Sequence, residues 1–281
     1  MTPLYFFFTL ATAFEIAQLL GKRWPISIGL VLLHCTFSCL ISLYPLWYSL
    51  MMGKVYPLDC PVGRLGWVLI GVLSGVGTSG LHTLWLFQSE SQRGVNVDSL
   101  SYRTSIERTL LVWVVSSFII TYTVGCLSFW FLVRMHGNST SGMLQLIALL
   151  AIVKFADAGA YFAGKAFGRH KLVPAISPGK TIEGLVGGML LSIMVAYVFF
   201  RLILPGFQVL ATGPFWGPAI LGCLLTLVGL VGDLLESMVK RTVGAKDSGA
   251  LLPGLGGVWD VTDSLLPAAI VGYLGIIAKL T

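Results

Sequence analysis

The residues of this sequence that could do chemistry are densest between positions 233 and 263. Asp233, Glu236 and Lys240 are spaced to share one face of a helix, and Asp260 and Asp263 share a face of the next one. Carboxylate oxygens are the ligands that Mg²⁺ prefers in proteins. The spacing therefore indicates a metal site, with interhelical ion pairing as the alternative.

The segment that joins these two helices is basic and rich in glycine. Lys240, Arg241 and Lys246 supply positive charge that can balance phosphate groups, and glycines such as Gly256 and Gly257 let the backbone approach a ligand closely. Two short sets of carboxylates joined by such a segment are what a magnesium–phosphate site requires. We therefore predict a site that binds Mg²⁺ together with a phosphate-containing substrate.

A second group of polar residues lies further upstream. Asp157 and Tyr161 are four residues apart, on one face of a helix. An acidic residue near the end of a membrane helix favours a functional site, because a charge there is costly unless it is paired. A structural ion pair with Lys154, three residues earlier, is the alternative.

A short polar segment, Ser177 to Thr181, directly precedes an apolar stretch that is predicted to be a helix. Its backbone amides and Lys180 would then lie at a helix N-terminus, which favours phosphate. A cap by Ser177 or Thr181, with Glu183 opposing the helix dipole, is compatible with this phosphate site. The Gly-Lys-Thr triplet does not fit a P-loop, because Pro174 stands where that motif needs glycine and no buried strand is expected before it.

These residues must be positioned by membrane helices. Hydrophobic residues make up 56% of the chain and charged residues 11%, against about 25% charged residues in a typical soluble domain. This composition excludes an ordinary soluble enzyme and a disordered chain, and the apolar segments do not alternate as the strands of a porin-like barrel would. The five cysteines form no Cys-x-x-Cys pair, so no zinc site is indicated. We therefore predict an all-α polytopic integral membrane protein.

About eight transmembrane helices are expected, since each needs about 20 apolar residues. The first is expected to be retained rather than cleaved as a signal peptide, because no basic residue precedes it and Lys22 and Arg23 follow it. The expected spans are residues 3–20, 26–50, 65–86, 110–132, 143–164, 184–204, 216–237 and 258–280.

The basic residues between the spans predict the orientation of the chain. Cytoplasmic loops carry an excess of Lys and Arg, and the two alternating sets of loops hold twelve and five of them, with Lys154 inside a span. The loops that carry the chemistry belong to the set with twelve. We therefore expect the active site at the cytoplasmic face of the cell (inner) membrane, with both termini outside. The formal charge of +6 is attributed to these loops, and no nucleic-acid partner is expected.

The two halves of the chain differ in their acidic residues. Seven of the twelve lie after position 150, in or beside apolar spans. Residues 143–281 are therefore predicted to form the catalytic transmembrane region. Residues 1–142 are predicted to form N-terminal helices that act as a scaffold or line a path for lipid.

The C-terminal region resembles the phosphatidate cytidylyltransferase (CDP-diacylglycerol synthase) family over about residues 154–264. Residues 1–142 resemble that family only in being hydrophobic. The matching segments are Asp157-x-Gly159-Ala160-Tyr161-x-x-Gly164, Ile176-Ser177-Pro178-x-Lys180-Thr181-x-Glu183-Gly184 and Ser237-x-x-Lys240-Arg241-x-x-x-x-Lys246-Asp247-x-Gly249-x-x-Leu252-Pro253-Gly254-x-Gly256-Gly257-x-x-Asp260-x-x-Asp263.

The resemblance implies an enzyme of phospholipid biosynthesis that transfers CMP from CTP to phosphatidate, with CDP-diacylglycerol and pyrophosphate as products. Its partners would be CTP, phosphatidate and membrane lipids, and its cofactor Mg²⁺; a second cation such as K⁺ and a homodimer are left open. The alternatives are a CTP-dependent transferase that acts on another membrane lipid phosphate, and a cation-coupled transporter. The predicted catalytic residues are Asp233, Lys240, Arg241, Lys246, Asp247, Asp260 and Asp263, with Asp233, Asp260 and Asp263 as metal ligands, and the predicted substrate-binding residues are Asp157, Ser177, Lys180, Thr181, Glu183, Ser237, Gly256 and Gly257.

The sequence departs from the family pattern at two positions. The family usually has His in the place of Leu255 and Arg in the place of Val261. The missing His removes an acid/base or phosphate contact, and the missing Arg removes a cation beside the metal carboxylates. Either other residues replace them or the lipid substrate differs.

Overall fold

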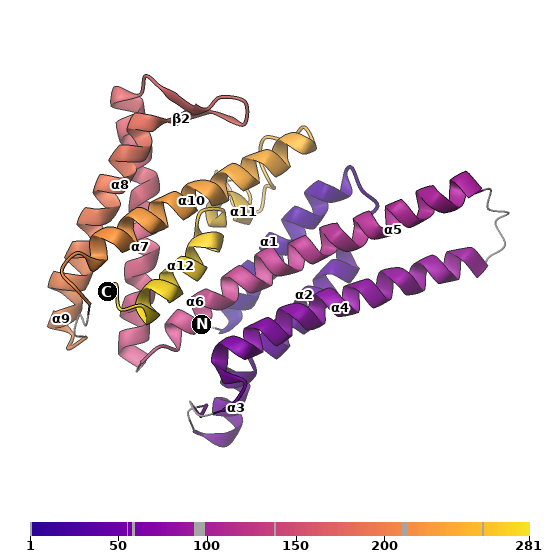
Figure 1. Ribbon diagram of the computed structural model, residues 1–281, viewed down its shortest axis with the longest axis horizontal. Coiled ribbons are helices and arrows are strands. Elements are labelled where there is room, and N and C mark those ends of the chain that lie inside the picture. The colour runs from indigo at the N-terminus through magenta and orange to yellow at the C-terminus, as the bar shows by residue number, and fades with distance from the viewer. Residues whose placement is uncertain are drawn as a thin grey trace. The chain divides into compact units, whose positions relative to one another are not determined.

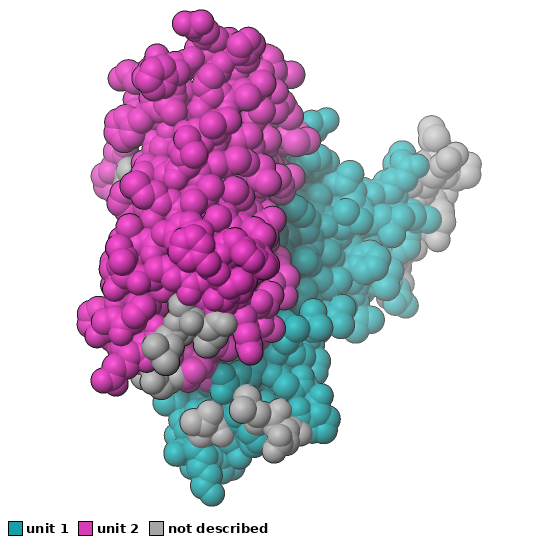
Figure 2. Space-filling view, turned by 60° about the vertical axis from the view of Figure 1, so that its left-hand side comes forward, with its two compact units in different colours: residues 1–128 teal, residues 129–281 magenta. Residues whose placement is uncertain are grey.

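The structure is a computed structural model that describes residues 2–54, 56–57, 60–92, 99–137, 139–209, 213–254 and 256–281. The chain divides into two compact units, residues 1–128 and residues 129–281, which are coloured separately in Figure 2. Both units consist of long helices, so the predicted all-α membrane fold is confirmed. Leu255, one of the two departures from the family pattern, lies outside the described residues.

Unit 1 is made of helices that pack against their neighbours in the sequence. Helix α2 contacts α1 and, beyond α3, α4, and α4 contacts α5. The elements are α1 (Thr2–Gly21), α2 (Ile28–Ser42), α3 (Tyr44–Met52), α4 (Gly63–Gln92), α5 (Ser99–Ile120), the π-helix η1 (Thr121–Gly125) and the start of α6 (Cys126–Arg134).

Unit 2 is built around α7, α8, α10 and α12, with a two-stranded hairpin at the end of α7 and α8 (Figure 1). Its elements are α7 (Ser139–Phe167), β1 (Lys171–Val173), β2 (Ser177–Thr181), α8 (Ile182–Tyr197), the π-helix η2 (Val198–Ile203), α9 (Leu204–Gly206), α10 (Gly217–Thr242), α11 (Val258–Thr262) and α12 (Leu265–Ile277).

The predicted membrane spans agree with the observed helices. Within the described residues, seven helices are long and apolar enough to cross a membrane. The predicted span 26–50 corresponds to α2 and α3, which meet at a bend of 53° and make an eighth span if they are counted together. Pro45 lies in the first turn of α3, where its missing N–H leaves no intrahelical hydrogen bond unmade. The prediction of about eight helices is therefore confirmed.

Small residues bring α7 and α8 close together. A Cβ atom at Gly184 would lie 2.7 Å from the Ala160 carbonyl oxygen, and one at Gly188 would lie 2.8 Å from that of Ala156. These two glycines are four residues apart, so they form one flat strip on α8 against which the α7 backbone packs. This contact brings the end of α7 that carries Asp157 beside the start of α8.

Hydroxyl groups join α8 to α10. Thr226 Oγ1 donates to Ser192 Oγ at 2.7 Å, and Ser192 Oγ lies 3.1 Å from the Gly222 carbonyl oxygen. Such hydrogen bonds between membrane helices satisfy hydroxyl groups that lipid cannot. Helix α10 is thereby held beside α8, with Asp233 further along the same helix.

The hairpin between α7 and α8 corrects one expectation from the sequence. Ser177 to Thr181 form strand β2, which pairs antiparallel with β1, so Lys180 lies on a strand, directly before the residue that caps α8. Only Thr181 acts as the helix cap, and its Oγ1 accepts a hydrogen bond from the Gly184 backbone N–H at 3.1 Å. The short polar segment satisfies its backbone groups by pairing with β1 before α8 begins.

The contacts divide the chain at residues 128 and 129, within α6. The predicted division at residue 142 concerned the roles of the two regions, and those roles stay predictions. Helix α7 and every element that follows it lie in unit 2, so the residues predicted to do chemistry belong to one compact unit.

Candidate active site

A cavity of about 490 Å³ in unit 2 collects residues from α7, the hairpin, α8, α10 and α11. Its apolar lining includes Leu185 and Leu230, and its polar lining comes from elements that are far apart in the sequence. Seven of the residues predicted to form the site lie on its wall. They are Asp157, Ser177, Lys180, Thr181, Asp233, Asp260 and Asp263.

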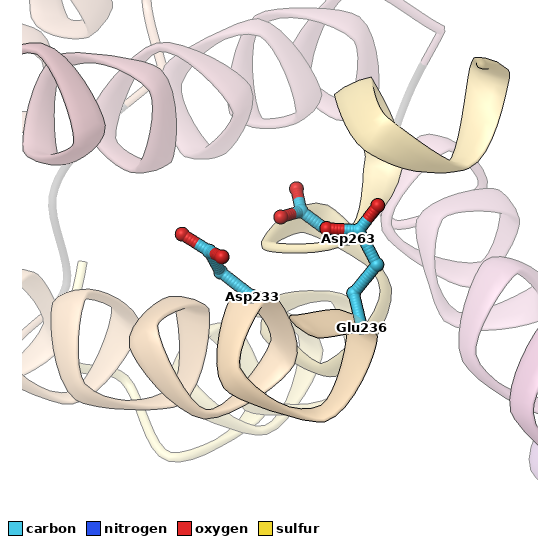
Figure 3. Close-up of side chains that lie close together, drawn as sticks. All are labelled: Asp233, Glu236 and Asp263. Carbon is cyan, nitrogen blue, oxygen red and sulfur yellow. The ribbon is translucent and has the colours of Figure 1, made fainter. Parts of the chain in front are cut away.

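Three carboxylates converge beside this cavity (Figure 3). Asp233 and Glu236 extend from α10 and meet Asp263, which directly follows α11. One oxygen atom from each side chain lies within 4.8 Å of one from each of the other two. Glu236 and Asp263 are buried and Asp233 is half-buried, and the three carboxylates meet the cavity through Asp233 and Asp263.

Asp260 lies near this group but has other partners. Its Oδ1 accepts a hydrogen bond from Lys240 Nζ at 2.9 Å, and its Oδ2 accepts one from the Gly257 backbone N–H at 2.6 Å. The Ser248 backbone N–H lies 3.2 and 3.1 Å from the two oxygens. Asp260 thus holds the segment between α10 and α11 in place, and its predicted role as a metal ligand stays a prediction.

Lys240 connects the two sets of acidic residues. Its Nζ lies 3.0 Å from Glu236 Oε1 and 2.9 Å from Asp260 Oδ1, and its side chain is only 14% exposed. The expected common face of Asp233, Glu236 and Lys240 on one helix is therefore confirmed. Lys240 pairs with carboxylates and does not line the cavity, and its predicted catalytic role stays a prediction.

Lys180 reaches the carboxylate group from the hairpin. Its Nζ forms an ion pair with Asp233 Oδ2 at 2.6 Å, and both side chains line the cavity. An ammonium group has three N–H donors. Because Asp233 is the one partner of Lys180 among the described residues, Lys180 has donors left for a bound phosphate. Ser177, on the same strand, also lines the cavity.

Asp157 takes part in an ion pair, as the alternative from the sequence anticipated. Its Oδ2 lies 3.2 Å from Lys154 Nζ and accepts a hydrogen bond from Ser264 Oγ at 2.9 Å. Asp157 remains 47% exposed on the cavity wall. Asp157 therefore forms the ion pair with Lys154 and also lies at the cavity.

Glu183 has a structural position outside the cavity lining. Its carboxylate accepts hydrogen bonds from the backbone N–H groups of Arg169 and His170 at 3.1 to 3.3 Å and lies 2.6 Å from His170 Nδ1. These contacts close the loop between α7 and β1. A direct substrate contact by Glu183 stays a prediction.

The remaining predicted residues lie on or near the segment that follows α10. Ser237 Oγ lies 3.5 Å from Asp233 Oδ1, at the limit for a hydrogen bond. Arg241, Lys246 and Asp247 are exposed and are not part of the cavity wall. Their predicted roles in binding phosphate would require this segment to move toward the cavity or the substrate to extend out of it.

Sequence reasoning left three residues of this site unassigned. Glu236 was placed on the right helical face but not among the metal ligands, although its spacing of three residues from Asp233 was the available signal. Lys154 was considered only as a partner of Asp157. Ser264 had no signal, because its contact with Asp157 joins positions 107 residues apart.

Gly256 is required by the contact between the loop and Asp260. Its φ of +87° is strained for other residues, and a Cβ atom there would lie 2.5 Å from Asp260 Oδ2. We expect Gly256→Ala to lower the melting temperature by about 2–4 °C and to reduce activity, because Asp260 must move.

Gly254→Ala is the matched control for this prediction. Gly254 has a similar φ of +81°, but a Cβ atom there meets open space. Thermal unfolding and turnover of the two purified variants separate backbone strain from the displacement of Asp260. Equal activity in both variants would contradict the role given to the Asp260 contact.

The donor set at the cavity suits a divalent cation. Five carboxylates, those of Asp157, Asp233, Glu236, Asp260 and Asp263, face three ammonium groups, those of Lys154, Lys180 and Lys240. Ligand oxygens of one octahedral Mg²⁺ lie about 2.9 to 4.1 Å from one another, so oxygens within 4.8 Å of one another would have to move closer to share one ion.

Comparison with known proteins gives one family match and several partial relatives. The sequence profile of the cytidylyltransferase family matches residues 1–277. A phosphatidate cytidylyltransferase of Brucella suis biovar 1 is 41% identical over 140 residues, which are 50% of this chain and 49% of that protein. One of Haemophilus influenzae is 41% identical over 127 residues, 45% of this chain and 43% of that protein. An Escherichia coli protein named "Uncharacterized protein YnbB" is 37% identical over 161 residues, 57% of this chain and 50% of that protein. The chain thus spans about half the length of the curated relatives it matches.

Proposed function

The chain belongs to the cytidylyltransferase family, and on this premise we propose that it transfers CMP from CTP to phosphatidate and releases pyrophosphate. The product would be CDP-diacylglycerol, an intermediate of phospholipid biosynthesis. The family membership agrees with the resemblance found in the sequence. The lipid substrate is inferred from the relatives of Brucella suis and Haemophilus influenzae, whose names state it.

One observation carries this proposal: the cluster of three carboxylates, Asp233, Glu236 and Asp263, lies beside Lys180 at one cavity between membrane helices. Asp233, Asp263 and Lys180 all line the cavity of about 490 Å³, where Lys180 Nζ pairs with Asp233 Oδ2 at 2.6 Å. A nucleoside triphosphate with its metal ion needs both kinds of group. The apolar helices around the cavity suit the acyl chains of a lipid.

The proposed reaction is an in-line displacement at the α-phosphorus of CTP. A phosphate oxygen of phosphatidate forms the new P–O bond, and the bond from the α-phosphorus to the oxygen bridging to the β-phosphorus breaks. Pyrophosphate leaves with that electron pair. The lipid phosphate is already an anion, so the reaction needs no strong general base, and the lack of the usual His at position 255 has less effect.

We assign the chain's own groups as follows. Lys180 binds a phosphate group and neutralises charge that develops on it, helped by the Ser177 hydroxyl on the same strand. Lys240 stays behind the cavity wall and keeps Glu236 and Asp260 oriented. Arg241 and Lys246, which are exposed, attract the anionic substrates toward the site.

Asp233, Glu236 and Asp263 are the residues that would hold Mg²⁺. Asp260 would become a further ligand if it gave up its hydrogen bond with Lys240 and bound the ion instead. When bound, the metal ion would supply positive charge at the phosphates of CTP. A second cation and a homodimer stay predictions.

The active site is proposed to lie at the cytoplasmic face of the inner membrane. The excess of Lys and Arg in the loops that carry the site supports this orientation. CTP is water-soluble and would enter from that side, whereas the lipid would enter from the bilayer. The alternative of a cation-coupled transporter gains no support, because the chain belongs to a transferase family.

Purified protein in detergent, supplied with radiolabelled CTP, Mg²⁺ and phosphatidate, tests the proposal. We expect lipid-extractable label in complete reactions and its loss when a chelator removes the metal. An isoprenoid phosphate and a reaction without acceptor serve as controls for the lipid substrate. Transfer to the isoprenoid phosphate alone would change the substrate, and no transfer to either acceptor by folded protein would overturn the proposal.

A further inference from the structure

Lys154 is a charge inside a membrane-spanning helix that the proposed reaction does not use. It lies within the apolar segment Thr140–Phe167 of α7, and its side chain is 40% exposed. A charge in such a segment is costly unless it is paired. The partners of Lys154 therefore indicate its role.

Three oxygen atoms surround its ammonium group. Nζ lies 3.2 Å from Asp157 Oδ2, 2.9 Å from the Val261 carbonyl oxygen and 3.1 Å from Ser264 Oγ. An ammonium group has three N–H donors and no acceptor. All three donors are thus used by protein oxygens, which leaves none for a substrate phosphate. Lys154 differs in this respect from Lys180, which has N–H donors left for a phosphate.

The three oxygens of Asp157, Val261 and Ser264 form an oxygen cage around the ammonium group, and two of them belong to the segment that also carries Asp263. Val261 lies in the last turn of α11, where helix carbonyls lack intrahelical partners. Ser264, just before α12, donates through Oγ to Asp157 at 2.9 Å and through its backbone N–H to Asp263 Oδ1 at 2.6 Å. The ammonium group therefore fixes the break between α11 and α12, on which the orientation of Asp263 depends.

We propose that Lys154 is a positioning residue whose ammonium group takes the place of a bound monovalent cation. This protein therefore needs no second metal ion such as K⁺ beside the cluster of Asp233, Glu236 and Asp263. The effect on turnover rests on the proposed function. Carboxylate, carbonyl and hydroxyl oxygens form a donor set that alkali-metal ions also accept. The same ammonium group supplies a positive charge beside the backbone carbonyl of Val261, in a chain that lacks the Arg side chain of the family pattern at that position.

Thermal stability tests this proposal without any activity measurement. Lys154→Met removes the charge and keeps an apolar side chain. We expect the variant to melt about 2–4 °C below the wild type in choline chloride and to regain most of that difference in KCl or NH₄Cl at equal ionic strength. The wild type is expected to melt at the same temperature in all three salts, because its cage already holds a cation.

Lys165→Met is the matched control, because Lys165 is on the same helix and is exposed over the ring of Tyr161. Its melting temperature is expected to be the same in choline chloride and in KCl. Transfer of CMP gives the second readout. We expect Lys154→Met to lose about ten-fold in rate in choline chloride, to recover several-fold with KCl, and the wild-type rate to be the same in both salts.

A wild-type melting temperature or rate that depends on K⁺ would overturn the proposal, and so would a folded Lys154→Met variant that responds equally to KCl and choline chloride. If that variant does not fold, the wild-type comparison still decides. Absence of CMP transfer by the wild type in every salt would instead count against the proposed function, and the melting temperatures would still test Lys154.

Discussion

Replacing Asp263 by Asn is expected to lower the rate of CMP transfer by about 10³-fold, equivalent to ~4 kcal/mol of transition-state stabilisation. The Oδ1 atom of Asn can still accept the hydrogen bond from the Ser264 backbone N–H, so the local fold should persist. The variant loses the negative charge that, with Asp233 and Glu236, would hold Mg²⁺. Turnover with labelled CTP, measured across a Mg²⁺ titration, checks this expectation.

Asp233→Asn should give a loss of similar size, because Asp233 belongs to the same carboxylate group and also faces Lys180. Glu107→Gln is the control for removing one negative charge, since Glu107 is exposed on α5 in unit 1. We expect this control to retain wild-type turnover. An Asp263→Asn variant that is folded and keeps more than about a tenth of the wild-type rate would rule out a metal site at this group.

Replacing Lys180 by Met is expected to reduce kcat/KM for CTP by about 10²-fold. The reason is that Lys180 is the cationic side chain on the hairpin that reaches into the cavity, where it pairs with Asp233 at 2.6 Å. Without it, charge on a bound phosphate has no partner from that side. Initial rates over a range of CTP concentrations separate a loss of binding from a loss of turnover.

Lys171→Met is the matched control on the same hairpin. Lys171 is exposed on β1, where it pairs in register with Thr181, and it is not part of the cavity wall. It should therefore behave as the wild type. If Lys171→Met and Lys180→Met lose activity equally, the effect would come from the general positive charge of the hairpin, and Lys180 would have no special role.

The apolar stretches of the sequence were enough to predict the class of the protein and most of its helices. An apolar stretch long enough to cross a membrane has to form a helix there, because backbone groups in lipid must pair within the segment. This reasoning predicted each of the eight spans found in the described part of the chain, counting the bent pair α2 and α3 as one. It did not predict the hairpin of Lys171–Val173 and Ser177–Thr181, because strands this short leave no clear periodic signal.

The sequence also determined which residues are neighbours on one helix. The spacing of Asp233, Glu236 and Lys240 fixes their common face through the helical period, and the Glu236–Lys240 ion pair follows from it. The ion pair of Lys154 with Asp157 is another local contact of this kind.

Contacts between side chains on different helices could not be predicted from the sequence and are seen in the fold. In the fold, Glu236 lies beside Asp263, and Asp260 accepts hydrogen bonds from Lys240 and from the backbone of the loop. Lys154 donates to the Val261 carbonyl oxygen and to Ser264 Oγ. These contacts depend on how closely α7, α8 and α10 pack and on the path of the segment between α10 and α11. The physical reason is that local spacing sets the angle of a side chain about its own helix axis, whereas the distance to another helix is set by packing of the whole unit.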